Sequence, residues 1–495
     1  MGRWIADSSL GGVGDVTGLR LSGDHGISGR TDHVDITIIG SNGTVTTKGD
    51  SFMAIVNSGL TDDGRGLAEQ ILSTKYFFPN FALTDKRIHQ DYANFLPPGW
   101  IGAETNDKFG TSFTQGDFNG DQSKDIVIGA PGESIGGITS AGIIHAIYGG
   151  TGGIGNNDAF YQGEGGWPGV PESGDEFGAA LTSADFNGDG FDDLAVGSPG
   201  DEIGGFDNAG MVTVAYGSVT GLGNQQIFHQ NTGGIGGAAA AGDRFGSSLA
   251  TGDINADGFD DLIIGVPGEY RCWPRVCGAV GGINIIYGSA NGLTSANDHY
   301  FTQNSRGIGG ISAVGDQFGA SVASGDIDND GFDDVIIGVP GDYRCWRRVC
   351  GAVGAINIMY GTGNGLSAAN DHYFTQNSSG VDGVSGVGDE FGAFVTTSDI
   401  NDDGFSDVII GTPGERISSR NNAGAVHVLY GTNNGTTTAN DTFLYVSQSL
   451  FTGSSQSNAR FGTSVTVIDN DLIIGAPGTT INGATAAGAI YYHTN

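Results

Sequence analysis

The 495-residue chain is poor in basic residues, in cysteine and in long hydrophobic stretches. Its 20 lysines and arginines stand against 55 aspartates and glutamates, giving a net charge of −35. Nucleic acid is therefore not expected as a partner, because its phosphates would meet a surface of the same sign. No run of 18 apolar residues occurs, so no segment is predicted to span a membrane. The amino-terminal sequence MGRWIADSSL also lacks the apolar core of a signal peptide.

Signatures of catalysis are missing as well. The nine histidines form no HExxH pattern and no cluster with cysteine, and there is no GxxxxGK phosphate loop. Paired carboxylates cleave glycosides in many hydrolases, but the acidic pairs of this chain are better explained as metal ligands, as described below. The sequence therefore predicts a protein that is not an enzyme.

What the chain has in abundance is glycine and short strands. It contains 91 glycines, yet an apolar content of 38% argues against disorder. Short apolar stretches separated by Gly, Asn and Asp clusters predict strands joined by hairpins, and no stretch has a helical period. In the unit that begins at Ser321, strands are expected at 321–327, 334–340 and 355–360, with a fourth from His372.

A Phe-Gly pair recurs six times, and a Gly-x-Pro-Gly motif follows each copy. The pairs begin at Phe109, Phe177, Phe245, Phe318, Phe391 and Phe461, at steps of 68, 68, 73, 73 and 70 residues. The second motif starts 20 residues after the Phe in the first five units and 14 residues after it in the sixth. Four strands repeated at this period are typical of propeller blades. The predicted fold is all-β: a ring of four-stranded antiparallel blades, which protects its sheet edges by closing.

A nine-residue acidic loop lies between the two motifs in units one to five. The loops are DFNGDQSKD, DFNGDGFDD, DINADGFDD, DIDNDGFDD and DINDDGFSD, and each has an acid or amide at positions 1, 3, 5 and 9. Oxygens at alternating positions of a tight turn converge on a point about 2.4 Å from each, which suits a hard cation such as calcium. Without a cation, the clustered carboxylates would repel one another.

The predicted ligands are the residues at loop positions 1, 3, 5, 7 and 9, which would hold about five calcium ions. They are Asp117, Asn119, Asp121, Ser123 and Asp125; Asp185, Asn187, Asp189, Phe191 and Asp193; Asp253, Asn255, Asp257, Phe259 and Asp261; Asp326, Asp328, Asp330, Phe332 and Asp334; and Asp399, Asn401, Asp403, Phe405 and Asp407. The first loop has Gln122 where the others have glycine for the sharp turn, so its affinity is expected to be the weakest. The sixth unit keeps only Asp469-Asn470-Asp471 and is expected to lose the metal.

Two other interpretations of the loops compete with metal binding. Asp, Asn and Gly are ordinary turn formers, so a single copy could be a solvated turn. An EF-hand would need a glutamate at position 12, where copies two to five have Val196, Ile264, Ile337 and Ile410. Repetition of the acid at position 9 in all five copies favours metal binding.

Together the Phe-Gly pair, the acidic loop and the Gly-Ala-Pro tripeptide resemble the FG-GAP repeat of the integrin alpha-subunit β-propeller and its bacterial relatives. The tripeptide is matched at Gly129-Ala130-Pro131 and Gly475-Ala476-Pro477, with Ser, Val or Thr in its middle position elsewhere. The resemblance extends from about Phe109 to the carboxyl terminus. It implies a seven-bladed propeller with calcium in the hairpin loops of one face and ligand contacts on the other.

The last unit ends after its third strand, so an amino-terminal strand is expected to close the ring. In the favoured arrangement, residues 34–107 form a degenerate first blade with VDITIIG and SFMAIVNSG as strands, and residues 108–495 form six FG-GAP blades. A strand near residues 16–21, within an arm of residues 1–33, then closes a seven-bladed ring. In the alternative, DYANF from Asp91 closes six blades and residues 1–90 are a separate appendage.

The four cysteines lie in two matched loops, YRCWPRVCGAVG and YRCWRRVCGAVG. Cysteines five apart at a hairpin tip reach the separation that a disulfide needs, which predicts the pairs Cys272 with Cys277 and Cys345 with Cys350. Reduced thiols or a zinc site shared between the loops are the alternatives. Disulfides in an acidic, calcium-rich chain indicate an extracellular or cell-surface location.

The same loops hold basic and aromatic residues that are scarce elsewhere, and Arg and Trp are enriched at binding hot spots. The candidate partner-binding residues are Arg271, Trp273, Arg275, Arg344, Trp346, Arg347 and Arg348. The loops are expected on the face opposite the metals, as a contact for an anionic or glycan partner or another copy of the chain. Alternatively, the arginines pair with Glu269 and Asp342, and the indoles cover the blade edge.

These features predict an extracellular, calcium-stabilised propeller that binds a protein or glycan partner in adhesion. The alternative is a structural subunit that self-assembles into an extracellular fibre or surface layer. A third interpretation is a propeller that is accessory to an enzyme whose catalytic domain lies outside this chain.

Overall fold

The computed structural model describes residues 16–25, 31–40, 43–48, 104–150, 157–273, 276–346, 349–447, 450–451, 453–468 and 470–494. Every regular element in these ranges is a β-strand, which confirms the all-β prediction. Because the described residues contain no helix, none of them forms a helical membrane span.

The described residues from 104 onward form six consecutive antiparallel blades, five with four strands and the last with three. Blade one consists of β4 (Phe113–Gly116), β5 (Asp125–Ala130), β6 (Ile143–Ile147) and β7 (Asn157–Phe160). Blade two consists of β8 (Ala180–Ala184), β9 (Asp193–Ser198), β10 (Met211–Tyr216) and β11 (Gly223–Phe228). Blade three consists of β12 (Ser248–Gly252), β13 (Asp261–Val266), β16 (Gly282–Tyr287) and β17 (Thr294–Phe301).

The remaining blades repeat this order. Blade four consists of β18 (Ser321–Gly325), β19 (Asp334–Val339), β22 (Ala355–Tyr360) and β23 (Ser367–Phe374). Blade five consists of β24 (Phe394–Ser398), β25 (Asp407–Thr412), β26 (Ala425–Tyr430) and β27 (Thr437–Leu444). Blade six consists of β28 (Ser464–Ile468), β29 (Asp471–Ala476) and β30 (Ala489–His493). Two short hairpins project from blades three and four: β14 (Tyr270–Trp273) with β15 (Val276–Ala279), and β20 (Tyr343–Trp346) with β21 (Val349–Ala352).

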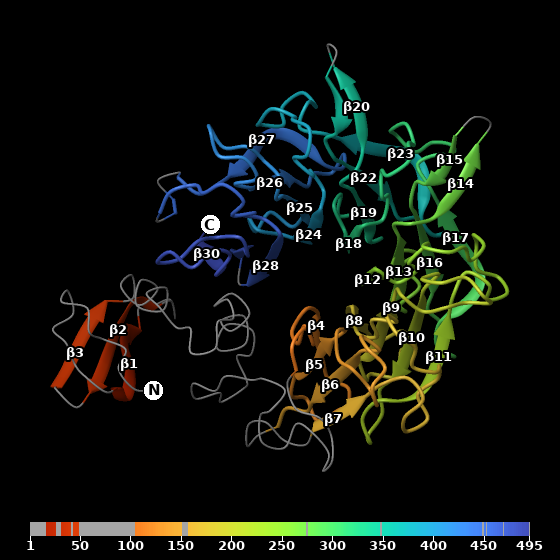
Figure 1. Ribbon diagram of the computed structural model, residues 1–495, viewed down its shortest axis with the longest axis horizontal. Helices are drawn as coiled ribbons and strands as arrows, with labels where there is room; N and C mark the ends of the chain where they lie inside the picture. The colour runs from red at the N-terminus through yellow and green to blue at the C-terminus, as the bar shows by residue number, and fades with distance from the viewer. Residues whose placement is uncertain are drawn as a thin grey trace.

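The six blades follow one another around an arc, with blades one and six at its ends (Figure 1). The first strand of each blade lies innermost, and β4, β8, β12, β18, β24 and β28 contact one another in that order. This is the arrangement of a propeller, in which blades pack face to face around an axis.

The amino-terminal strands form a separate sheet of β1 (Val16–His25), β2 (Thr31–Gly40) and β3 (Gly43–Lys48). Residues 16–21, expected to close the ring, instead pair with β2, because a strand five residues away costs less chain entropy to reach than blade six. VDITIIG lies in β2, as expected for a strand, whereas SFMAIVNSG and DYANF fall outside the described residues. Six blades beside a separate sheet match the alternative arrangement and not the favoured seven-bladed ring.

The expected strands of the unit at Ser321 are found with one difference. Three begin at the predicted residues, but β23 begins at Ser367 instead of His372. Asn370 has a left-handed backbone with φ 63°, and the pairing register shifts between Ile358 and Tyr360. Such a bulge interrupts the alternation of polar and apolar residues, so the polar SAAND segment did not indicate a strand.

The hydrophobic core lies between neighbouring blades. All residues of β13, β19 and β25 are buried. Ile263 and Ile283 of blade three, for example, pack in one cluster with Val335 and Val339 of blade four. Since each blade buries its faces against the next, burial of apolar surface holds the array together.

The Phe-Gly pairs also join neighbouring blades. Phe177, Phe245, Phe318, Phe391 and Phe461 are fully buried. Phe318 forms a parallel bridge with Gly281 of the preceding blade, and the N–H of Gly319 donates to the carbonyl of Gly338 in its own blade. The motif therefore anchors the first strands of blades two to six on both sides.

Candidate functional site

The acidic loops connect the first and second strands of blades one to five. Loop four, for example, joins β18 to β19. Because all five occupy the same connection, they lie at the same end of their blades. In blade six, β28 and β29 are joined by only two residues, so that blade keeps the hairpin without an acidic loop, as predicted.

Each loop is shaped by its own side chains. In loop two, Asp185 accepts the N–H of Asp189 on Oδ1 (3.1 Å) and that of Gly190 on Oδ2 (2.8 Å). Asn187 Oδ1 accepts the N–H of Asp189 at 2.8 Å. The same bonds from position 1 recur in the other four loops. These Asx-type turns hold positions 1 and 3 on the inside of the turn.

The aspartate at position 9 is the buried member of each set. Asp334 is 1% exposed, and its two oxygens accept the N–H groups of Ile327 and Gly361, both at 3.0 Å. Burial raises the pKa of Asp334 from its ordinary 3.8 to about 8, although these hydrogen bonds oppose the shift; Asp328 and Asp330 add to it. Burial likewise raises the pKa of Asp125, Asp193, Asp261 and Asp407 to about 7, 7, 8 and 6. Position 9 therefore favours a neutralising partner, either a proton or a cation.

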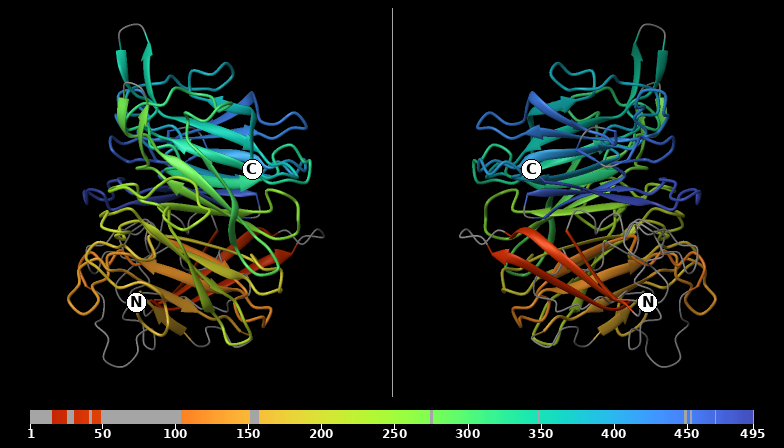
Figure 2. Two further views of the ribbon diagram at one scale, coloured as in Figure 1. Left: turned by 90° about the vertical axis from the view of Figure 1, so that its right-hand side faces the viewer. Right: turned by 90° about the vertical axis from the view of Figure 1, so that its left-hand side faces the viewer.

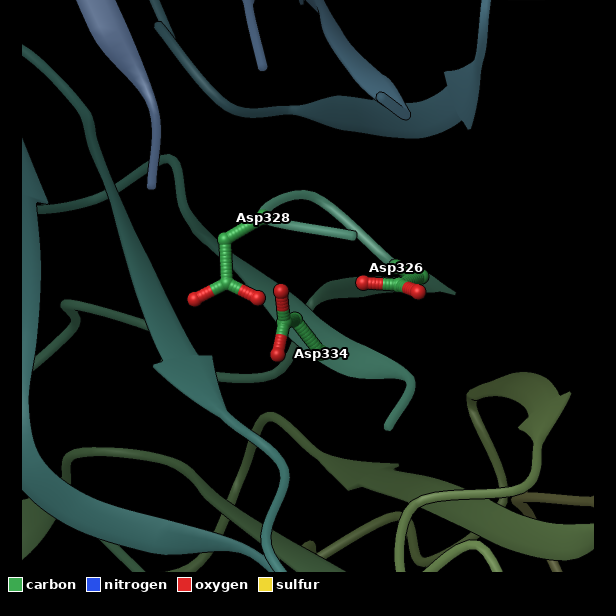
Figure 3. A group of neighbouring side chains, drawn as sticks. All are labelled: Asp326, Asp328 and Asp334. Atoms are coloured by element: carbon green, nitrogen blue, oxygen red, sulfur yellow. The ribbon is translucent and has the colours of Figure 1, made fainter. Parts of the chain in front are cut away.

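Loop four shows the convergence most directly. Oxygens of Asp326, Asp328 and Asp334 all lie within 4.8 Å of one another. Their carboxylates face one small space (Figure 3). Oδ1 of Asp328 is buried and has no hydrogen-bond partner. A buried orphan oxygen beside two further carboxylates, with no sulfur or nitrogen donor, fits a hard cation such as calcium.

The remaining predicted ligands have less direct support. Asp330, at position 5, is exposed, and its Oδ1 accepts the N–H of Phe332 at 3.1 Å. Phe332, at position 7, offers only its backbone oxygen. Gln122 of loop one adopts the left-handed turn with φ 64° despite its side chain, and its N–H donates to Asp117. Loop one therefore has the expected turn, although glutamine is less suited than glycine to the left-handed backbone conformation.

Both predicted disulfides are present. Cys272 pairs with Cys277 and Cys345 with Cys350, each with a Cα separation of 4.1 Å across its hairpin. Since β13 starts at the acidic loop and ends just before Tyr270, the hairpin leaves the end of the blade opposite the loops. The two hairpins project from neighbouring blades on the same side of the molecule (Figure 2).

Two arginines of the candidate partner surface are held by local acids. Nε of Arg271 lies 3.1 Å from Glu269, and the guanidinium stacks over Tyr300 at 4.7 Å. Arg344 pairs in the same way with Asp342 at 2.7 Å and stacks over Tyr373 at 4.8 Å. The pairing of these two arginines with Glu269 and Asp342, which the alternative interpretation expected, is therefore present. Arg275, Arg347, Arg348 and the side chains of Trp273 and Trp346 lie outside the described part.

A second set of acids on the hairpin side of the blades was not predicted. Asp243 is 0% exposed and Glu269 is 2% exposed. Burial raises the pKa of Asp243 to about 7, and the nearby Glu269 adds to the shift. Acids occupy the same two sequence positions at Asp107 and Glu133, Asp175 and Asp201, Asp316 and Asp342, and Asp389 and Glu415; all of them are buried except Asp201, which is half-buried. In the first five units, an acid two residues before the Phe-Gly pair and another directly after the Gly-x-Pro-Gly motif form a signal that could have revealed them.

A polar pocket of about 240 Å³ lies beside loop two, between blades two and three. It is lined by Asn187, Asp189, Tyr216, Asn224, Ala290, Asn291 and Gly292. Asn187 and Asp189 are also predicted metal ligands, so the pocket adjoins the candidate metal loop.

Comparison with known families matches the FG-GAP repeat at residues 109–147, 177–214, 245–282, 318–356 and 391–429. Each segment begins at a Phe-Gly pair and covers the first two strands and part or all of the third strand of one of blades one to five. The chain therefore contains five FG-GAP repeats, and its described blades have a propeller arrangement.

Among curated proteins the chain is similar to integrin alpha chains. It is 34% identical to integrin alpha-PS5 of Drosophila melanogaster over 170 residues, 34% of this chain and 15% of that protein. It is 30% identical to integrin alpha pat-2 of Caenorhabditis elegans over 208 residues, 39% of this chain and 14% of that one. Phosphatidylinositol-glycan-specific phospholipase D of Mus musculus is 36% identical over 164 residues, 32% of this chain and 18% of the enzyme. The matches span less than a fifth of each relative.

Solved structures show only a distant likeness. A rhamnogalacturonan lyase of Bacillus licheniformis aligns over 93% of this chain and 65% of its own, with 12% identity and a TM-score of 0.36. A similarity of this size carries no conclusion about activity.

Proposed function

We propose that this chain is a calcium-stabilised binding propeller that acts in adhesion, outside the cell or at its surface, by recognising a protein or glycan partner. The observation that carries the proposal is the convergence of Asp326, Asp328 and Asp334 within an FG-GAP loop that recurs in five blades. Similarity to integrin alpha chains supports the adhesive role.

In this proposal the residues at positions 1, 3, 5, 7 and 9 hold the ion of each loop. Calcium supplies positive charge that offsets the repulsion among the carboxylates and ties the loop to the start of the second strand. The aspartate at position 9 already links these parts through two backbone N–H groups. Ion binding and blade packing thus stabilise the same junction.

The hairpin side is the proposed partner surface. Tyr270 and Tyr343 are 50% and 47% exposed beside the two disulfides, and Val314 and Val387 are also exposed. Glu269 and Asp342 hold the two arginines in place. The exposed tyrosines and valines then form an aromatic and aliphatic surface beside the cross-linked strands. Exposed apolar groups on a rigid support are typical of recognition sites.

The experiment that tests the function combines calcium binding with partner capture. Purified chain, stripped with EDTA, is titrated with calcium and then applied to arrays of glycans and of extracellular proteins in calcium or in EDTA. Retention of one ligand class by a monodisperse protein in calcium, reduced by Tyr343→Ala, supports the proposal. Concentration-dependent particle growth without ligand would favour the self-assembling subunit instead. Failure to take up calcium, or capture that is equal in EDTA, overturns it.

A further inference from the structure

Neighbouring acidic loops are joined through the residue at loop position 8, which is not among the predicted metal ligands. Asp192, at position 8 of loop two, accepts the N–H of Asp117 on Oδ2 at 2.7 Å. Its own N–H donates to the carbonyl of Asp117 at 3.1 Å. Asp117 is position 1 of the loop in the preceding blade, so one residue holds both backbone polar groups of a predicted ligand.

The contact is repeated along the array. Asp260 of loop three accepts the N–H of Asp185 at 3.3 Å. Asp333 of loop four accepts the N–H of Asp253 at 3.0 Å and donates its own N–H to that residue's carbonyl at 3.1 Å. All three position-8 aspartates are half-buried. Three repetitions across separate blade junctions indicate a feature of the array and not a chance surface contact.

Loop five provides a natural comparison. Its position 8 is Ser406, whose N–H donates to the carbonyl of Asp326 at 2.9 Å. Serine brings no carboxylate to this junction, so the contact consists of the backbone bond that Asp192 and Asp333 also make. Loop one has Lys124 at position 8, and its ammonium lies 3.3 Å from Asp192 instead.

We propose that the calcium loops are coupled in series, each position-8 aspartate transmitting the ordering of its loop to position 1 of the loop in the preceding blade. The proposal rests on calcium binding as proposed above. An ion held by positions 7 and 9 fixes position 8 between them. The preceding loop then loses less conformational entropy when it binds its own ion, which gives positive cooperativity. Because coupling of binding is reciprocal, each loop also favours its follower.

This arrangement predicts that the strength of coupling differs between junctions of the array. Loops one to four are connected by carboxylate contacts, whereas loops four and five share only the contact of Ser406. Coupling between loops four and five is therefore the weakest. Each position-8 aspartate is a positioning residue for the ion of its neighbour.

The test is a calcium titration of the EDTA-stripped full chain by calorimetry, with native mass spectrometry counting the ions on each molecule. In the wild type, intermediate states are depleted relative to independent sites. Asp260→Ser, which copies loop five, should weaken binding in loop two by about fivefold or more and populate partly loaded molecules. Ser406→Asp should shift the distribution in the opposite direction. Asp402→Asn, which removes an exposed charge from position 4 of loop five and keeps an oxygen that can accept the Nδ2 group of Asn470, is the control for charge and should leave cooperativity unchanged.

The outcomes separate the two proposals. Absence of calcium uptake removes the premise and overturns both. Full uptake by independent sites, with Asp260→Ser and Ser406→Asp both indistinguishable from wild type, overturns the coupling alone. If Asp260→Ser does not fold, Ser406→Asp decides the matter, because it adds a carboxylate without removing a contact.

Discussion

The carbonyl oxygen of Gly319 lies so close to Gly265 of the preceding blade that a Cβ on Gly265 would be 2.1 Å from it. The same separation is found at the other four junctions, between the first glycine of Gly-x-Pro-Gly and the glycine of the next Phe-Gly pair. These pairs are Gly129 and Gly178, Gly197 and Gly246, Gly338 and Gly392, and Gly411 and Gly462. The two motifs therefore recur together because their glycines touch across each blade boundary.

Gly265→Ala should destabilise the protein by about 2 to 3 kcal/mol, because the methyl group would force two backbones apart in a packed interface. The measurement is urea unfolding followed by circular dichroism. Gly223→Ala is the matched control, since nothing lies within 4 Å of a Cβ at that position. Equal stability of the two variants would show that the contact has no energetic role.

Calcium removal should lower both melting temperature and resistance to proteolysis. Each occupied loop stabilises the folded state by about 2.7 kcal/mol when free calcium is one hundred times its dissociation constant. Calorimetry in excess EDTA and after calcium is restored measures the difference. An unchanged melting temperature would remove the structural role assigned to the ion.

Asp334 and Asp330 should contribute differently to the free energy of unfolding when no metal is bound. Asp334→Ala leaves the buried N–H groups of Ile327 and Gly361 unpaired and should cost about 2 to 4 kcal/mol in EDTA. Asp330→Ala removes an exposed side chain and should cost little in EDTA while weakening calcium binding. Unfolding of both variants with and without calcium distinguishes a structural aspartate from a ligand. Similar losses for both in EDTA would contradict this division of roles.

In the absence of calcium, stability should fall as pH rises from about 4 to about 7. Burial raises the pKa of Asp316 and of Asp175 from 3.8 to about 7, with Asp342 and Asp201 adding to the respective shifts. A raised folded-state pKa means that the folded chain binds the proton more tightly, so this stabilisation is complete below 3.8 and is lost as pH passes the folded value.

The measurement is the free energy of unfolding in EDTA at a series of pH values. Asp316→Asn, which does not titrate, should flatten the profile in this window. A wild-type profile that rises across the same range would show that these acids are charged in the folded protein.

The sequence predicted those parts of the molecule whose signals are local. Asp117 and its counterparts occur at fixed loop positions, and Cys272 and Cys277 are close enough in sequence to meet across one hairpin. The repeat period defined the blades because each is one complete supersecondary unit.

Long-range and irregular features were not predictable in the same way. Whether residues 16–21 pair with β2 or with blade six depends on a competition between local and distant partners. The start of β23 was missed because of the bulge at Asn370. Buried acids such as Asp243 went unnoticed, since aspartate beside glycine normally indicates an exposed turn.

The disulfide hairpins occur on blades three and four, and they distinguish these two blades from the other, similar blades of the propeller. Because the blades resemble one another, a partner could otherwise bind at several nearly equivalent positions around the ring. A partner that contacts both cross-linked hairpins can bind in only one rotational orientation about the propeller axis. The two insertions on neighbouring blades therefore define the orientation of a bound partner.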